Sequence, residues 1–201
     1  MTSKIRFAAA LLVVILAFSL VSCGATTPAD VCENFISAVK KCDADGAMDC
    51  VLSPATIGNH VYSINQAKEN GDKYGIETLE KLYSFVKYTV ISKNVELDEA
   101  GSETVISETG KQTVRIEMSA PDFDSLMSLI MSEVAFSSQP KTDVLADFIE
   151  DGTVGRYIKK STLNVVFTEK DGEWRIPFSQ SENRQLYETL GLSYFASWFL
   201  G

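Results

Sequence analysis

The chain has 201 residues, with 18 basic and 27 acidic side chains, a formal net charge of −9, and 45% hydrophobic residues. This balance argues against a nucleic-acid partner, because binding to phosphate backbones needs clustered Lys and Arg. The longest basic runs are only the pairs Lys40-Lys41 and Lys159-Lys160. A chain of this size and hydrophobicity can bury one substantial core, so we expect a single folded domain over residues 29–201.

Residues 1–22 have the three-part layout of an export signal. Lys4 and Arg6 give a positive start, an apolar run of 15 residues follows at 7–21, and the small Ser22 precedes Cys23. The run is shorter than the roughly 20 residues that a helix needs to span a bilayer. The end of the segment, "LVSC" at 20–23, resembles the lipobox of bacterial lipoproteins.

The lipobox resemblance implies a lipid anchor. In such proteins the cysteine thiol takes a diacylglyceryl group, the signal is cut just before it, and the new amine can be acylated as well. We therefore expect an extracytoplasmic protein, anchored to the bacterial cell membrane by acyl chains on Cys23, with residues 23–28 as a short tether. The alternatives are a plain secreted protein and an uncleaved single-pass anchor. Loss of residues 1–22 leaves 16 basic residues against 27 acidic ones, a net charge of about −11.

Three cysteines lie beyond the lipobox, at Cys32, Cys42 and Cys50. An extracytoplasmic location permits a disulfide. A helix over 28–42 would separate Cys32 from Cys42 by about 15 Å along its axis, beyond the roughly 7 Å limit for a bridge. Cys42 with Cys50 is therefore the favoured pair, and three reduced, buried thiols are an equally open alternative.

The first part of the folded chain has helical signals. Thr27, Pro28 and Asp30 predict the start of a helix, and apolar residues recur at helical spacing as far as Cys42. We expect Asp45 to cap a second short helix that ends before residue 54. A further helical face runs over 76–86.

From about residue 88 the pattern changes to strands. The stretch "QTVRIEMSA" at 112–120 alternates strictly, and "TLNVVFTEKDGEWRIPF" at 162–178 predicts a hairpin that turns at Asp171-Gly172. Between them, 123–149 reads as a helical insert. The apolar tail at 190–201 predicts a terminal helix docked on the core, with a dimer contact or a membrane-touching surface as alternatives. The fold class is therefore α+β, with helices first and a curved antiparallel sheet after them.

The order of these segments resembles bacterial lipoproteins with a nuclear-transport-factor-two-like, or cystatin-like, cone domain. The resemblance rests on the lipobox, on "TPADVCENFISAVKKCDADGAMDCVLSP" at 27–54 and on "VVFTEKDGEWRIPF" at 165–178. It implies a long N-terminal helix in the concavity of a bent sheet. Residues 55–85 and 121–152 are additions to that pattern, and they could cover or fill the cone. The same cone hosts isomerases, dehydratases and binding domains, so the fold alone does not assign a function.

The sequence offers few residues for catalysis or metal binding. His60 is the only histidine, which excludes a site built from several histidines, and we expect it at the surface or at a helix end. The chain has no His-Glu-x-x-His, Walker or Gly-x-Gly-x-x-Gly motif. We predict no metal and no cofactor, and we assign no catalytic residue.

Two hypotheses of function follow. The first is a lipid-anchored extracytoplasmic binding or interaction module of the bacterial cell envelope, with an envelope protein or a small hydrophobic ligand as its partner. The alternative is an enzyme with a cone-shaped apolar pocket that acts on a small hydrophobic or envelope-derived substrate. Such an enzyme needs a carboxylate base and polar donors in the pocket, for which Tyr62, Tyr83, Tyr88 and Asp122 are the candidates. A sealed cone with an exposed apolar patch would favour binding.

Overall fold

The computed structural model describes residues 27–92, 95–97, 103–105, 110–178 and 181–201. The expected signal peptide, Cys23 and the tether up to residue 26 lie outside these residues. Among the described residues, no helix has the length and apolar character needed to cross a membrane.

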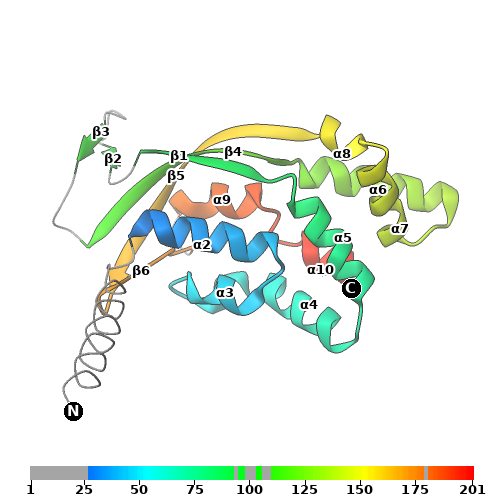
Figure 1. Cartoon of the computed structure of the whole chain (residues 1–201), viewed down its shortest axis with the longest axis horizontal. Helices are drawn as coiled ribbons and strands as arrows, with labels where there is room; N and C mark the ends of the chain where they lie inside the picture. The colour runs from blue at the N-terminus through cyan, green and yellow to red at the C-terminus, as the bar shows by residue number, and fades with distance from the viewer. Residues whose placement is uncertain (1–26, 93–94, 98–102, 106–109, 179–180) are drawn as a thin grey trace, which may run out of the picture.

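The described chain is a mixed α+β structure, as the sequence predicts (Figure 1). The first group of elements is helical: α2 (Pro28–Lys40), α3 (Ala44–Asp49), η1 (Pro54–Ile57), α4 (Gly58–Glu69) and α5 (Lys73–Tyr83). The middle group contains β1 (Lys87–Ser92), β2 (Val95–Leu97), β3 (Glu103–Val105), β4 (Lys111–Pro121), α6 (Phe123–Ser137), α7 (Lys141–Glu150) and α8 (Thr153–Arg156). The last group contains β5 (Ile158–Lys170), β6 (Glu173–Arg175), η2 (Ser181–Asn183), α9 (Arg184–Thr189) and α10 (Phe195–Leu200).

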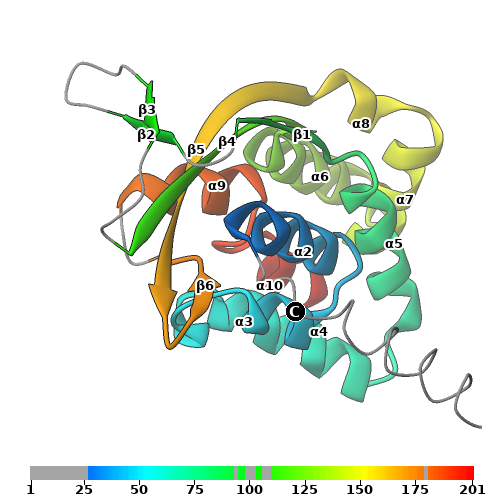
Figure 2. The same cartoon turned by 60° about the vertical axis from the view of Figure 1, so that its left-hand side comes forward.

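The sheet is antiparallel and curved, with the strand order β1-β4-β5-β6 (Figure 2). Both views place α2 between this sheet and the helices α3 and α4, while α6, α7 and α8 gather at the end of the sheet away from β6. A β-bulge interrupts the pairing of β1 with β4. The long N-terminal helix against a curved antiparallel sheet is confirmed.

Helix α2 begins as its sequence predicts. The Thr27 hydroxyl accepts a hydrogen bond from the Asp30 backbone N–H at 3.2 Å, and the Asp30 carboxylate accepts one from the Thr27 N–H at 2.9 Å. This reciprocal capping box satisfies two of the N–H groups that a helix start leaves unpaired. One expectation nearby is wrong, because Asp43 rather than Asp45 caps α3, with its carboxylate accepting from the Gly46 N–H at 3.1 Å. The backbone of Cys42 turns sharply with φ of +48°, so α3 starts sooner than the sequence suggests.

The late hairpin is also confirmed. Asp171 and Gly172 have φ of +55° and +81°, which is the backbone that a two-residue turn between twisted strands requires. Along the sheet, Val114 lies opposite Val165 and Ile116 lies opposite Leu163. All four of these side chains are buried, so the alternation read from the sequence identifies the inner face of the sheet.

Strand β6 is short and pairs only with the end of β5. Beyond that pairing, the side chain of Asn183 bonds to the backbone of β5 in place of a strand. The side-chain oxygen of Asn183 accepts from the Val166 N–H at 2.8 Å, and its amide nitrogen donates to the Val166 carbonyl at 2.8 Å. Asn183 is fully buried. An unpaired buried backbone group costs about 1–3 kcal/mol, so one side chain here satisfies two groups that the sheet itself leaves open.

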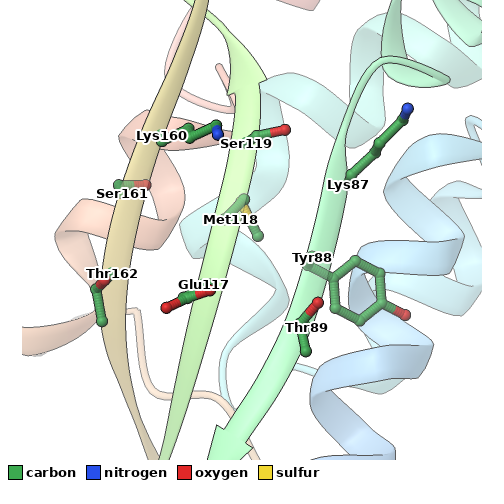
Figure 3. Close-up of a pocket in the computed structure, with 9 residues that line it drawn as sticks. All are labelled: Lys87, Tyr88, Thr89, Glu117, Met118, Ser119, Lys160, Ser161 and Thr162. Atoms are coloured by element: carbon green, nitrogen blue, oxygen red, sulfur yellow. The ribbon is translucent and has the colours of Figure 1, made fainter.

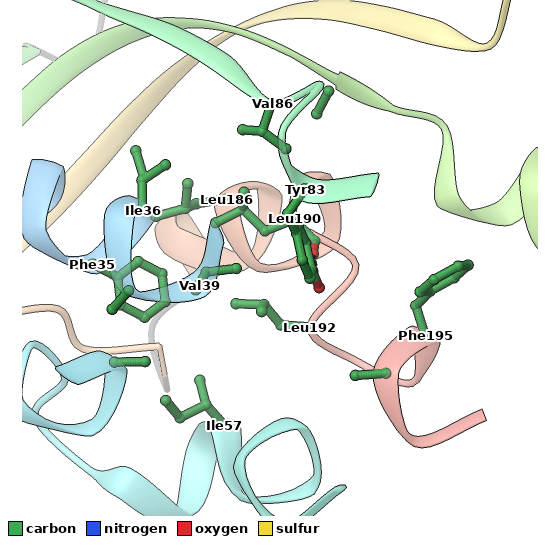
Figure 4. Close-up of a cluster of buried hydrophobic side chains, with 14 of the residues drawn as sticks. Phe35, Ile36, Val39, Ile57, Tyr83, Val86, Leu186, Leu190, Leu192 and Phe195 are labelled. Carbon is green, nitrogen blue, oxygen red and sulfur yellow. Dashed lines mark hydrogen bonds between the residues drawn. The ribbon is translucent and has the colours of Figure 1, made fainter. Parts of the chain in front are cut away.

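The concave side of the sheet is filled with apolar side chains. Buried residues from α2 to α10 form one connected core. Figure 4 shows α2 residues meeting side chains from η1, α5 and the C-terminal segment, among them Ile36, Val39, Ile57, Leu186 and Leu190. The additional helical residues 55–85 therefore help to fill the space that an open cone would leave empty.

The apolar tail docks into this core, as expected, although only part of it is helical. Phe195, Ala196 and Phe199 of α10 are buried. The residues before α10 form a loop with Gly191 at φ of +63°. That glycine separates α9 from α10.

His60 lies in the first turn of α4, at a helix end as one of the two expectations has it, but it is not at the surface, because its side chain is only 2% exposed. It lies on the inner face of α4 with Ile64 and Ala67, which are also buried. Its ring stands edge-on to the Tyr83 ring, with 6.2 Å between centroids and an interplanar angle of 81°. Both imidazole nitrogens are buried without a hydrogen-bond partner in the described structure. Burial lowers the pKa of His60 from 6.5 to about 4, because a charged imidazole cannot be solvated there.

We predict that His60 makes the fold sensitive to mild acid. The unfolded chain takes up a proton on this residue as the pH falls below 6.5, whereas the folded chain does so only near pH 4. The free energy of unfolding should therefore lose about 3 kcal/mol between pH 7 and pH 4 through this group alone. The substitution His60→Phe, which keeps an aromatic ring beside Tyr83, should remove that part of the loss. Urea denaturation of the unmodified chain and of His60→Phe at pH 7, 5.5 and 4 measures how the free energy of unfolding of each depends on pH. The contribution of the carboxylates is the same in both proteins, so it cancels when the two profiles are subtracted. Parallel stability profiles would contradict the prediction.

Candidate functional site

An open groove lies beside the C-terminal helices, with a volume of about 750 Å³. It lies between η1, the start of α6, α9 and the loop from α9 to α10. This volume is within the range of about 300–1,000 Å³ that small-molecule sites occupy.

Four aromatic side chains line the groove: Phe123, Phe178, Tyr187 and Tyr194. Phe178 and Tyr187 pack together with 5.6 Å between ring centroids, and Phe178 also packs at 5.3 Å against Phe35 of α2. Tyr194 is 38% exposed. One wall is thus fixed to the core through α2, while Tyr194 remains open to a ligand.

Phe123 is held in place from behind. Its ring packs on Tyr83 and on Phe195, with centroid distances of 5.7 and 5.0 Å. On the groove side it lies against the backbone of Gly191, so close that a Cβ atom on that residue would stand 2.6 Å from the ring. Gly191 is therefore required twice, for its positive φ and for the contact with Phe123.

The rim of the groove is polar. Arg184 and Glu188 form an exposed ion pair on one turn of α9, with 2.6 Å between Nε and Oε1. Glu188 holds the pKa of Arg184 above its usual range through this hydrogen bond. Asp124 and Ser193 add a carboxylate and a hydroxyl. An apolar floor with a polar edge suits a ligand that has an aromatic or aliphatic body and a few polar substituents.

Asp122 lies next to the groove in a structural role. Its carboxylate caps α6 by accepting from the Ser125 N–H and hydroxyl at 3.4 and 2.5 Å, and it pairs with Lys159 at 2.7 Å. Burial alone would raise its pKa, but these hydrogen bonds outweigh burial and lower it. Asp122 is therefore an anionic cap rather than a proton carrier near neutral pH.

The four residues considered for an enzyme do not form one site. Tyr62 is 65% exposed on α4, and Tyr88 lies half-buried on β1. Tyr83 is fully buried and donates its hydroxyl to the Leu190 carbonyl at 3.2 Å. With Asp122 capping α6, the four side chains lie on separate elements. The described residues also contain no group of three or more His, Cys, Asp or Glu side chains arranged to hold a metal ion.

The cysteines fall into two groups. Cys23, the expected lipid-attachment residue, lies outside the described residues. Cys32, Cys42 and Cys50 are buried free thiols, and burial is the main cause that raises their pKa values, to about 12, 12 and 11 respectively. Thiols with such pKa values stay protonated and unreactive at neutral pH. The Cys42–Cys50 disulfide stays a prediction for the exported protein.

No sequence motif points to the groove. Its aromatic residues are scattered along the chain: Phe123 opens the predicted helical insert, Phe178 ends the predicted hairpin, Tyr187 precedes the apolar tail and Tyr194 lies within it. The signal that could have revealed it is Gly191, which interrupts the apolar tail at the point where the chain turns back over Phe123.

Comparison with known proteins adds little. No protein-family model and no curated protein match the chain. Among solved structures, a crystal structure of a candidate lipoprotein, YcdA, from Bacillus subtilis matches 72% of this chain with 12% sequence identity and a TM-score of 0.32. The chain spans about half, 49%, of the length of that protein.

We predict that Gly191→Ala destabilises the fold more than Gly152→Ala. Both glycines have positive φ, at +63° and +78°, which costs an alanine about 1–2 kcal/mol. A new methyl group at Gly152 meets open space, whereas at Gly191 it must displace the Phe123 ring. The additional loss should be about 1–3 kcal/mol, as for overpacking of a core. Thermal unfolding of the two variants measures it, and equal losses would show that Phe123 does not press on this backbone.

Proposed function

We propose that this protein is a lipid-anchored extracytoplasmic binding module of a bacterial cell envelope. The observation that carries the proposal is the position of the first helix. Cys23, at the end of the lipobox-like segment, is followed after only three residues by Thr27, whose capping box fixes the start of α2. A signal and anchor at 1–23 thus lead directly into the folded region, with residues 29–201 forming one domain.

The short connection has a physical consequence. Four residue steps from Cys23 to Thr27 span at most about 14 Å when fully extended. Acyl chains on Cys23 would therefore hold the body of the protein against the membrane surface. Two or three such chains give stable attachment, whereas one alone binds reversibly.

The proposal includes the cone-domain resemblance. Its support is the long α2 helix on the concave side of a curved antiparallel sheet, together with the late hairpin at Asp171-Gly172. The filled interior distinguishes this chain from a cone that holds its ligand inside (Figure 4). We therefore propose that binding takes place in the aromatic groove, and that the ligand is a small hydrophobic molecule or an apolar segment of an envelope protein.

The groove favours binding over catalysis. Its aromatic side chains supply apolar surface, and most of what a ligand can still cover belongs to Tyr194, because Phe123 is already buried and Phe178 and Tyr187 are partly buried. The polar groups at the rim, such as the Arg184–Glu188 pair, are exposed. Such an arrangement can orient a bound molecule, while the affinity comes from the aromatic floor.

We predict that Cys23→Ser abolishes the lipid anchor. Cells expressing the variant and supplied with a labelled fatty acid should produce unlabelled protein that is released from the membrane fraction. Cys32→Ser is the matched control, because Cys32 is a buried thiol of α2 that belongs neither to the lipobox nor to the predicted Cys42–Cys50 disulfide. The control protein should keep its label. Fatty-acid labelling that survives in Cys23→Ser would refute the anchor.

We predict that Tyr194→Ala weakens binding of an apolar probe to the groove. N-phenyl-1-naphthylamine, whose fluorescence rises in apolar surroundings, should bind the unmodified chain and lose about tenfold in affinity when the aromatic surface of Tyr194 is removed. Tyr74→Ala is the control, since Tyr74 is 50% exposed on α5, away from the groove. Equal losses in both variants would show that the probe binds elsewhere. This test is independent of the anchor, because it does not depend on Cys23.

A further inference from the structure

A second hollow, of about 430 Å³, lies on the sheet over β1, β4 and β5. Figure 3 shows the residues that line it. Within these strands Ile116 and Met118 of β4 are buried, whereas Glu117 is exposed and Ser119 is partly exposed. The hollow therefore includes the outward-facing residues of the sheet, on the face turned away from α2.

The strand register places two lysines on either side of one hydroxyl. Lys87 of β1 lies opposite Ser119 of β4, and Ser119 lies opposite Lys160 of β5. Residues that lie opposite one another in antiparallel strands share a face. Because neighbouring strands are about 4.8 Å apart, the two lysine backbones are roughly 10 Å apart with Ser119 midway.

The next outward-facing row has a different character. Thr89 lies opposite Glu117, and Glu117 lies opposite Thr162. A cationic row is thus followed along the same face by a row with one carboxylate between two hydroxyls. The alternation of side chains along a strand separates the two rows by two residues, or about 7 Å.

The two lysines are available for a ligand. Neither Lys87 nor Lys160 has an ion pair or a side-chain hydrogen bond within the described part of the chain, and both are exposed. The adjacent Lys159, by contrast, is paired with Asp122 at 2.7 Å. The chain as a whole is acidic, with 27 acidic and 18 basic residues. The two unpaired lysines beside the Ser119 hydroxyl therefore form a locally positive site on a negatively charged protein.

We propose that this face binds the phosphate monoester of a small hydroxylated molecule. A phosphate monoester carries a charge of about −1.5 to −2 at pH 7 and three strong acceptor oxygens. Two ammonium groups and the Ser119 hydroxyl supply matching charge and donors. A carboxylate, with a single charge, would compensate only one of the lysines.

The second row restricts the ligand further. Glu117 can accept hydrogen bonds from hydroxyl or ammonium groups next to the phosphate. The hydroxyls of Thr89 and Thr162 can both donate and accept hydrogen bonds. The same carboxylate repels a second phosphate, which disfavours a polyphosphate and a continuous anionic surface. The occupant is therefore a soluble monoester.

The side chains of Lys87 and Lys160 point in different directions. Figure 3 shows the Lys160 side chain extending toward Ser119, whereas the Lys87 side chain extends away from it. The flexible four-carbon stem of Lys87 allows its ammonium group to turn over the row when an anion arrives. We therefore expect Lys160 to contact the anion without rearranging, and Lys87 to contact it only after its side chain has turned toward Ser119.

The test uses the full chain in neutral detergent micelles and glycerol 3-phosphate as the probe, followed by backbone amide resonances in NMR titrations. We expect saturable shifts at Ser119 and its neighbours in β1 and β5. The double substitution Lys87→Gln with Lys160→Gln should weaken binding at least about tenfold. Lys41→Gln with Lys73→Gln is the control of equal charge, since Lys41 directly follows α2, Lys73 begins α5, and both are exposed outside the hollow. The double replacement of Lys87 and Lys160 by Arg should restore binding.

Three results would overturn the proposal. Equal weakening in the control double variant would mean that only total charge matters. Binding of glycerate as tight as that of glycerol 3-phosphate would remove the preference for phosphate. Attachment to phosphatidylglycerol vesicles through Lys87 and Lys160, without binding of glycerol 3-phosphate, would identify a membrane surface instead. None of these results bears on the aromatic groove, which lies on other elements.

Discussion

The structure depends on the burial of the apolar face of α2 against the concave side of the sheet. Phe35, Ile36 and Val39 are at most 1% exposed, and each contributes roughly 1.5–3 kcal/mol by leaving water. The alternating residues of β4 and β5 supply the opposite surface. Because the sheet curves around this helix, the two surfaces meet along their length, and the remaining helices fill the space at the sides (Figures 1 and 2).

The aromatic groove is built outward from this packing. Phe35 of α2 contacts Phe178, and Phe178 contacts Tyr187, so a row of rings leads from the core to the groove wall. On the other side, Tyr83 and Phe195 fix Phe123, and the Tyr83 hydroxyl is bonded to the backbone at Leu190. The groove is therefore preorganised by the same contacts that stabilise the fold. A ligand that entered it would lose little energy in ordering these side chains.

Local features of the fold could be predicted from the sequence, because each is decided by neighbouring residues. The capping box at Thr27, the alternation of β4 and the turn at Asp171-Gly172 depend on residues within a few positions of one another. The burial of His60 could not be predicted in this way. Nothing beside it in the chain indicates burial, which results from the way α4 packs its inner face against α5 and α10. The groove and the lysine row likewise join segments that are far apart in the sequence, so only the register and packing of the whole fold bring them together.

The filled interior also explains where binding can occur. Side chains from α2, η1, α5 and the C-terminal segment occupy the concavity, so a ligand could enter it only by displacing a close-packed core (Figure 4). Recognition is then confined to surfaces that packing leaves open. The polar residues that are buried, such as Asn183 with its two bonds to Val166, stabilise the framework. The lysine row lies outside that framework, where a change of residue can alter what is bound at little cost in stability. In the aromatic groove the same holds only for exposed side chains such as Tyr194.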